Sequence, residues 1–236
     1  MSTRHIPIVI CRNCALYNTA QALGLESPNC STLDQVVIRN HPVERNETLF
    51  SAGDPVRYLY LVHSGSCISY NRKEPHQIMG FYLPGEVVGI EDIGEPIHSH
   101  SAFALENGSL CQLDFTALET SLMPEELSRV LKYLLQAAAI HARQLQEERL
   151  VTGLPSAEQR IAGFLLSLAK RFESHGLPSR QYRLPMSREE MAGYLGLAPE
   201  TVIRTLRRLH SRGLISIQTR QVHILEPDAL DKLLAA

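Results

Sequence analysis

The sequence lacks long apolar runs. Nowhere does the chain contain the roughly 18 consecutive apolar residues that a membrane-spanning helix needs. The one apolar run near the N-terminus, residues 6–10, is too short for the core of a signal peptide. With 236 residues, 44% hydrophobic and 20% charged, the composition is that of a folded protein with room for two ordinary domains. We therefore expect a cytosolic protein.

Signatures of catalysis are missing as well. The sequence shows no nucleophile–base arrangement, no Gly-rich phosphate loop and no pair of catalytic carboxylates, so we do not expect an enzyme. The rival from this class is a cupin-like barrel that binds a small molecule or a catalytic metal ion. It would require a His-x-His pair and a further histidine, all facing inward. His98 and His100 in "PIHSHS" are the only hint, and we expect them on an exposed loop.

Cysteines are few and odd in number. The five of them, in a reducing compartment, indicate packed thiols, metal ligands or redox thiols rather than a disulfide framework. Cys11 and Cys14 form a C-x-x-C pair, which is weak evidence alone, and Cys30 follows after a gap. Cys30 directly precedes a serine that we interpret as the cap of a helix over residues 31–40. Cys67 is expected to be a packed strand residue.

Charge is distributed unevenly. Residues 1–154 carry 11 Lys and Arg against 17 Asp and Glu, a net charge of −6, whereas residues 155–236 carry 12 against 8, a net charge of +4. This asymmetry predicts that the C-terminal third meets a polyanion. Two domains of different pI without such a partner remain the alternative.

Short strands dominate residues 48–114. Segments such as "YLYLVHSGSCISY" and "QIMGFYLPGEVVGI" are bounded by Gly, Pro, Asn or Asp. Regular short strands with turn signals predict an antiparallel barrel or jelly roll, and the helical pattern that follows gives the α+β class.

A helical pattern follows Pro124. Apolar positions recur at spacings of four and three, which predicts an a/d seam about three heptads long on one helix. The seam consists of Leu127, Leu131, Leu134, Ala138, His141 and Leu145. It fits either a homodimer interface or core within one chain. Glu147 lies just beyond it, and like charges facing each other across a two-fold axis would weaken pairing.

The segment "MSREEMAGYLGLAPETVIRTLRRLHSRGLI" predicts a helix-turn-helix. Ser187 and Glu190 form a capping box that begins one helix, which ends near Gly196. Pro199 suits the first turn of the second helix, which in this motif enters the major groove of DNA. Alternating residues in "LISIQTRQVHIL" predict a hairpin behind it, which makes a winged helix. "SAEQRIAGFLLSLAKRF" predicts a supporting helix.

The second helix has an exposed polar face. Glu200 and Arg204, one turn apart, can read base edges, and Arg207, Arg208 and Arg212 suit phosphates. The expected DNA-contacting residues are Ser187, Glu200, Thr201, Ile203, Arg204, Arg207 and Arg208. The alternative is a solvated face with a Glu–Arg pair.

Taken together, these segments resemble the family that contains the cyclic-AMP receptor protein and the fumarate-and-nitrate-reduction regulator, and in particular the branch of the latter. The likeness covers nearly the whole sequence, through "LFSAGDPVRYLYLVHSGS", "GFYLPGEVVGIEDIG", "FALENGSLCQLD" and the helix-turn-helix segment, in that order.

The resemblance implies a cyclic-nucleotide-binding-like jelly roll, a dimerisation helix and a winged helix-turn-helix that binds a palindromic operator as a homodimer. The expected divisions are a cysteine-bearing segment at 1–30, the sensor at 31–124, the dimerisation helix at 125–154 and the DNA-binding domain at 155–236. It also implies contact with RNA polymerase, including through the loop around Ile90 to Glu95. Members of this branch carry a serine where this chain has Ile203, so the half-site sequence is open.

The same resemblance bears on the signal. Cyclic-nucleotide binders of the family hold the phosphate with an arginine after the Gly-Glu motif, but residues 85–111 contain no Arg or Lys, so cAMP is not expected. Relatives in this branch bind a four-iron, four-sulfur cluster through four cysteines. Cys11, Cys14 and Cys111 match three of these positions, while Ala20 stands near the remaining one and Cys30 is the nearest replacement. A cluster with Cys30 as ligand, a paralogue without a cluster, and a thiol redox switch all stay open.

Overall fold

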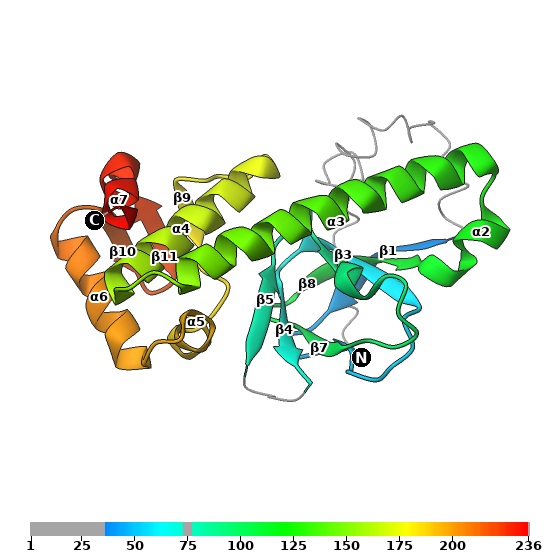
Figure 1. Ribbon diagram of the computed structural model, residues 1–236, viewed down its shortest axis with the longest axis horizontal. Coiled ribbons are helices and arrows are strands. Elements are labelled where there is room, and N and C mark those ends of the chain that lie inside the picture. Colours follow the sequence, from blue (N-terminus) through cyan, green and yellow to red (C-terminus); the bar gives the residue numbers. More distant parts are fainter. Residues whose placement is uncertain (1–35, 73–76, 236) are drawn as a thin grey trace, which may run out of the picture.

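The computed structural model describes residues 36–72 and 77–235. Its N-terminal part is a barrel of two four-stranded antiparallel sheets. The first sheet runs in the order β1 (Val37–Val43), β8 (Gly108–Asp114), β3 (Tyr58–Ser64) and β6 (Val87–Val88). The second runs in the order β2 (Thr48–Phe50), β7 (His100–Ala104), β4 (Cys67–Asn71) and β5 (Ile78–Tyr82). The predicted jelly roll is confirmed, and Figure 1 shows the barrel beneath one long helix.

One predicted helix is wrong. Residues 37–40, expected to be helical, belong to strand β1, which pairs with β8 from Val37↔Leu113 to Val43↔Gly108. Consecutive β-branched residues favour an extended chain, and pairing with β8 satisfies its backbone. Val36 is buried in the apolar cluster under the long helix. Residues 31–35 lie outside the described part of the chain.

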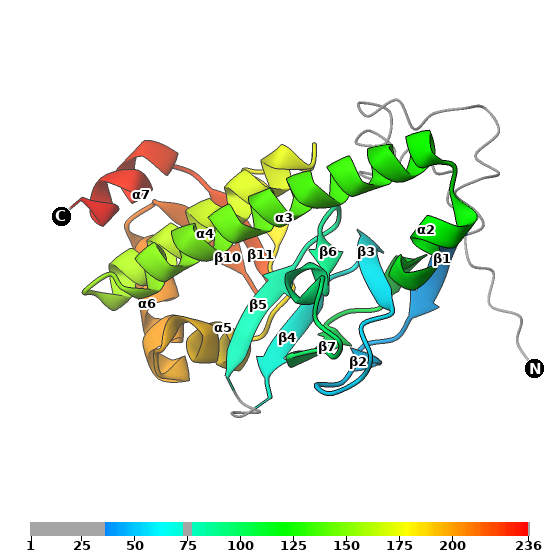
Figure 2. The same cartoon turned by 45° about the vertical axis from the view of Figure 1, so that its right-hand side comes forward.

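Helices connect the barrel to a C-terminal unit. They are η4 (Phe115–Ala117), α2 (Leu118–Ser121), α3 (Pro124–Thr152) and α4 (Ala157–Ser174), whereas η3 (Ile90–Asp92) lies within the barrel between β6 and β7. Helix α3 crosses the barrel, and α4 turns back beside it (Figure 2). The C-terminal unit then adds β9 (Gln181–Arg183), α5 (Arg188–Leu195), α6 (Pro199–Ser211), β10 (Ile215–Gln218), β11 (Gln221–Ile224) and α7 (Pro227–Leu234). None of the helices in the described ranges is long and apolar enough to cross a membrane.

The predicted winged helix is confirmed. Strands β10, β11 and β9 form one antiparallel sheet, so the hairpin follows the second helix of the helix-turn-helix directly. Its apolar core is continuous with the barrel. The ring centroids of Phe81 on β5 and Tyr194 on α5 lie 5.0 Å apart, and those of Tyr194 and Phe164 on α4 lie 5.5 Å apart. The two units therefore pack as one body.

A buried ion pair connects the barrel and the C-terminal unit. Arg171 on α4 donates to Glu86 through Nε at 2.9 Å and through Nη2 at 2.6 Å. Helix α3 joins them, because Gln144 Nε2 donates to Glu86 at 3.0 Å and Glu148 accepts from Arg171 at 3.3 Å. Burial opposes ionisation of Glu86, but the charge and hydrogen bonds of Arg171 outweigh it and lower the pKa of this carboxyl.

The turn that carries Glu86 can lie this close only because of a glycine. Gly85 has φ +98°, and a Cβ there would lie 2.4 Å from Nδ1 of His175, near the end of α4. Glycine therefore permits both the backbone conformation and the contact.

A second buried network links the barrel to α3. His98 and His100 are fully buried, contrary to the expected exposed loop. Asp92 Oδ2 lies 3.0 Å from Nδ1 of His98 and 3.2 Å from Nδ1 of His100, while Nε2 of His100 lies 3.2 Å from Glu91. Carboxylates and a stacked Phe50 ring thus let these imidazoles sit inside the barrel. The two histidines and the two carboxylates pair one after another and, among the described residues, do not surround a common metal position.

Breaking the Arg171–Glu86 pair is expected to destabilise the protein strongly. Arg171→Met leaves the Glu86 carboxylate buried without its partner, which costs about 3–5 kcal/mol of unfolding free energy. Arg183→Met is the matched control, because it breaks the exposed Arg183–Glu106 pair between the same two units, worth about 0–1 kcal/mol. Urea unfolding followed by circular dichroism measures both. Equal losses in the two variants would contradict the prediction.

Acid is expected to weaken the Glu91 network. Burial alone would raise the pKa of Glu91, but the imidazoles of His100 and His141 and the Tyr82 hydroxyl lower it to about 2. Because the folded pKa lies below the unfolded value, the stabilisation is present above pH 4.5 and is lost as pH falls toward 2.

Glu91→Gln should therefore flatten the loss of stability over this pH range. The measurement is the unfolding free energy at several pH values, with Glu119→Gln on the exposed surface of α2 as control. An acid limb that is unchanged in Glu91→Gln would show that this carboxyl carries none of it.

Candidate functional site

The first helix of the helix-turn-helix, α5, is capped at both ends. Ser187 Oγ accepts from the Glu190 backbone N–H at 3.1 Å, and Glu190 accepts from the Ser187 N–H at 2.5 Å, so the predicted capping box is present. Gly196 ends the helix with φ +64°, a conformation that glycine adopts without strain. Ser187 is thereby engaged within its own helix cap.

The second helix, α6, buries one face and exposes the other. Pro199 stands in its first turn, and Val202, Leu206 and Leu209 are buried in the core of the C-terminal unit. This packing fixes the rotation of α6 about its axis. The opposite face is therefore presented to solvent as one continuous strip.

That exposed strip holds the residues expected to read DNA. Glu200, Ile203, Arg204 and Arg207 are all exposed, while Thr201 is half-buried. Within the described residues, neither Arg204 nor Arg207 forms an ion pair, so both guanidinium groups are available. An arginine fork can donate to O6 and N7 of guanine, and a carboxylate can accept from N4 of cytosine. The strip can therefore contact base edges in a major groove.

The arginines on the flank of α6 are arranged differently. Arg208 and Arg212 both form ion pairs with Glu158, which lies in the first turn of α4. Sequence reasoning assigned Arg208 to phosphates and missed Glu158. The spacing of 50 residues between them gives no local signal, because only the packing of α4 on α6 brings them together.

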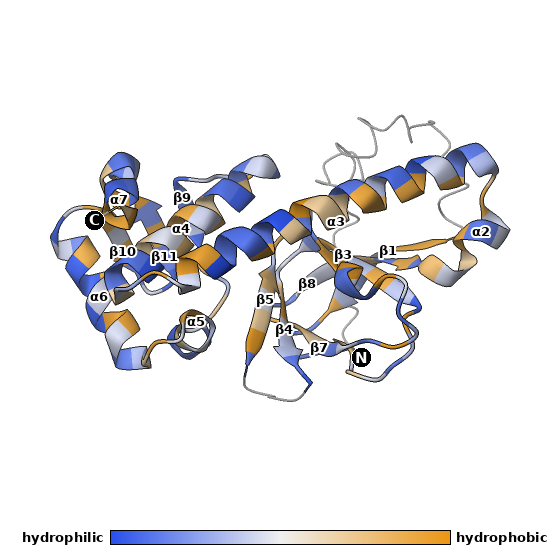
Figure 3. Ribbon diagram, viewed as in Figure 1, coloured by the Kyte–Doolittle hydropathy of each residue, from blue (hydrophilic) through white to orange (hydrophobic). Residues whose placement is uncertain are grey.

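Helix α3 carries apolar residues among polar ones along its length (Figure 3), and several of the apolar side chains face solvent as a stripe. Leu135 is 72% exposed and Leu131 is 45% exposed, and Leu145 lies on the same side. The predicted seam falls across two faces. Leu134 is buried against the barrel of its own chain, while Leu127, Ala138 and His141 are half-buried at the edge. Sequence reasoning missed Leu135, because heptad spacing alone does not show which face meets the barrel.

Glu147 forms an ion pair with a residue of its own chain. Its carboxylate lies 2.8 Å from Nζ of Lys170 on α4. The charge that was expected to face a second copy is thus balanced within one subunit.

Two cysteines lie in the described part of the chain. Cys111 on β8 is 7% exposed and belongs to the apolar cluster between the barrel and α3, together with Val130 and Leu134. Cys67 on β4 is buried, and burial raises the pKa of its thiol to about 12. Cys11, Cys14 and Cys30 lie outside the described residues. Among those described, no three His, Cys, Asp or Glu residues are arranged to hold a metal ion.

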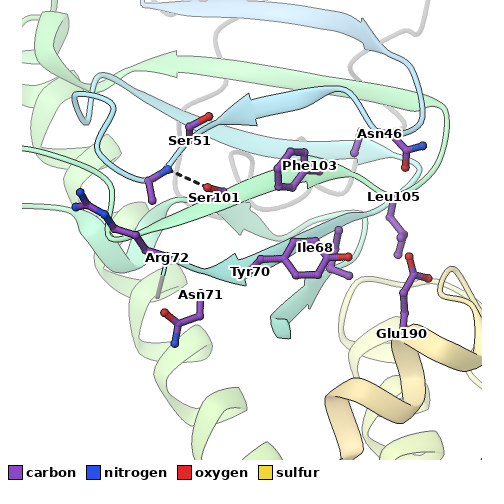
Figure 4. A pocket seen from close by; sticks show the side chains of 12 residues that line it. Asn46, Ser51, Ile68, Tyr70, Asn71, Arg72, Ser101, Phe103, Leu105 and Glu190 are labelled. Atoms are coloured by element: carbon purple, nitrogen blue, oxygen red, sulfur yellow. Dashed lines mark hydrogen bonds between the residues drawn. The ribbon is translucent and has the colours of Figure 1, made fainter. Parts of the chain in front are cut away.

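A pocket of about 560 Å³ lies between the second barrel sheet and α5. Its floor is apolar and comes from Ile68 and Tyr70 on β4 and Phe103 on β7, with the two aromatic rings 5.9 Å apart. Figure 4 shows Arg72 and Glu190 at opposite ends of it. Since Glu190 belongs to the cap of α5, this pocket lies between the barrel and the helix-turn-helix.

Comparisons with known proteins agree with this architecture. Residues 40–123 match the family model of the cyclic nucleotide-binding domain, and residues 159–233 match that of the Crp-like helix-turn-helix domain. Among solved structures, FixK2 from Bradyrhizobium japonicum superposes with a TM-score of 0.73 at 30% identity, covering 85% of this chain and 98% of that one.

Similar curated proteins are regulators. The transcriptional activator protein Anr of Pseudomonas aeruginosa is 35% identical over 228 residues, which are 96% of this chain and 93% of that protein. The fumarate and nitrate reduction regulatory protein of Escherichia coli K12 is 31% identical over 225 residues, 94% of this chain and 89% of that protein. With a cyclic-nucleotide-binding-like barrel followed by a winged helix-turn-helix, this chain belongs to the CRP/FNR family of DNA-binding transcription regulators.

Proposed function

We propose that the protein is a cytoplasmic homodimeric transcription activator that binds a palindromic operator and is not an enzyme. The observation that carries the proposal is the exposed strip of α6. Burial of the opposite face of this helix keeps Arg204 and Arg207 directed toward solvent. The relative Anr is named as a transcriptional activator, which supports activation here. Recruitment of RNA polymerase is proposed through exposed residues such as Glu95, because Ile90 and Asp92 of the same loop are buried.

Dimerisation is proposed through the exposed stripe of α3. Leu131, Leu135 and Leu145 recur at helical spacing on a face that the barrel leaves uncovered. Two copies paired on this stripe bury it and place two α6 helices on the same side of the assembly. Two half-sites about one helical turn apart suit such a pair.

The signal is proposed to be oxygen, nitric oxide or redox state, through one 4Fe-4S cluster per subunit. Thiolates are the donors that such clusters require, and Cys111 with Cys11, Cys14 and Cys30 would hold it. When bound, the cluster would supply a group that reacts with oxygen or nitric oxide. Support comes from the position of Cys111, whose side chain packs with Val130 and Leu134 of α3. A change at its sulfur would therefore change how this helix packs on the barrel.

Cyclic AMP is not the proposed signal. Glu86, in the Gly-Glu turn, is already bonded to Arg171, and Glu91 and Asp92 add negative charge nearby. An anionic phosphate in this region would meet carboxylates rather than a cation. The alternative function is a paralogue without a cluster that is constitutive, controlled by thiol oxidation or triggered by another ligand.

Leu135→Glu is expected to separate the dimer. A carboxylate in the middle of a buried stripe is costly, so the variant should sediment as a monomer. Its affinity for a palindromic fragment, selected from random DNA because Ile203 leaves the half-site open, should fall at least about tenfold, a difference of 1.4 kcal/mol.

Ile140→Glu is the control, since Ile140 is 46% exposed on the same helix but lies about 140° around its axis from Leu135. Analytical ultracentrifugation and gel-shift titration measure both. A Leu135→Glu protein that remains dimeric would rule out this stripe as the interface.

Purification without oxygen is expected to yield a coloured protein with iron and acid-labile sulfide in equal amounts. Cys111→Ala should lose both, whereas Cys67→Ala should keep them, because Cys67 is a buried strand residue of the other sheet. Visible absorption and iron and sulfide assays are the measurements. A colourless, iron-free wild-type protein that still binds DNA would support the cluster-free alternative.

A further inference from the structure

The three arginines of the recognition helix α6 and Arg212, which caps its C-terminal end, fall into two pairs with different surroundings. Arg204 and Arg207 lie on the exposed strip and, among the described residues, form no ion pair. Arg208 and Arg212, on the flank, both reach Glu158 on α4. The chain thus places one carboxylate against two guanidinium groups beside its DNA-contacting surface.

Glu158 is held firmly in this position. Its side chain is only 14% exposed, whereas those of Arg208 and Arg212 are 57% and 46% exposed. Each carboxylate oxygen meets a different arginine, Oε2 with Arg208 and Oε1 with Arg212. The residue also lies in the first turn of α4, where the helix dipole favours a negative charge. The acid is therefore a fixed part of the scaffold.

We propose that Glu158 determines specificity by withholding Arg208 and Arg212 from the phosphate backbone. Attraction between arginine and phosphate does not depend on sequence, so every additional phosphate contact raises affinity for all DNA alike. Glu158 neutralises one of the two flanking charges and turns both side chains toward α4. Base contacts from the strip of α6 then make up a larger share of the binding free energy.

The proposal rests on DNA binding through α6 and has a calculable consequence. Each phosphate contact contributes about 0.9 to the slope of log K against log salt. Releasing one unit of positive charge per subunit adds one such contact, so a dimer should gain up to about 1.8 in slope. Near 0.15 M salt, one or two added contacts correspond to non-specific binding that is about five- to thirtyfold tighter.

The experiment compares Glu158→Gln with wild type on poly(dI-dC) and on the selected palindrome, across a salt series. Glu158→Gln is expected to bind poly(dI-dC) more tightly, with a steeper salt slope and a smaller ratio of specific to non-specific affinity. Glu173→Gln removes the same charge from the exposed C-terminal end of the same helix and is expected to leave these quantities unchanged. Thermal melts confirm that each variant is folded.

A triple variant tests whether the tighter non-specific binding acts through the two released arginines. Glu158→Gln with Arg208→Gln and Arg212→Gln should lose the gain, because the released cations are then absent. The inference is overturned if Glu158→Gln binds poly(dI-dC) no more tightly than wild type, or if the gain survives in the triple variant. A wild-type protein that fails to bind any DNA at low salt would instead overturn DNA binding itself, so the two failures are distinguishable.

Discussion

The arrangement of the whole chain depends on the buried bond between Arg171 and Glu86. It joins a turn of the barrel to a helix of the DNA-binding unit across 85 residues of sequence, and Gln144 and Glu148 bring α3 into the same contact. A buried pair of this kind adds little net stability over apolar packing, but it tolerates only one relative placement of its partners. Burial also raises the pKa of Glu148, so it is the one of the two carboxyls in this contact that ionises less readily.

Around this bond, α3 serves three surfaces at once. One face packs on the barrel through Val130 and Leu134, a second faces solvent with Leu131 and Leu135, and its C-terminal end contacts α4. A change beneath the helix, at the level of Cys111, would therefore act on an element that also carries the exposed apolar stripe and contacts the DNA-binding unit. Under the proposed function, no separate relay is needed between sensing and readout, because α3 touches all three surfaces.

Much of this architecture was accessible from sequence, for reasons that differ between its parts. The helix-turn-helix carries local signals, namely the Ser187–Glu190 box, Gly196 and Pro199, each of which acts within a few residues. The strand at residues 37–43, the burial of His98 and the contact made by Glu158 depend on partners brought together by the fold. A serine cap pattern or a His-x-His spacing has several solutions locally, and tertiary pairing decides among them.

The length of α3 gives the molecule a mechanical property. A helix of 29 residues is about 43 Å long, at 1.5 Å per residue. If its barrel end is the fulcrum, a tilt of about 5° moves the far end by about 4 Å, which is close to the 3.4 Å rise of one base pair. Such a tilt would also draw Gln144 and Glu148 away from Glu86 and Arg171, so the buried contact holds the recognition helix at a fixed distance from the barrel.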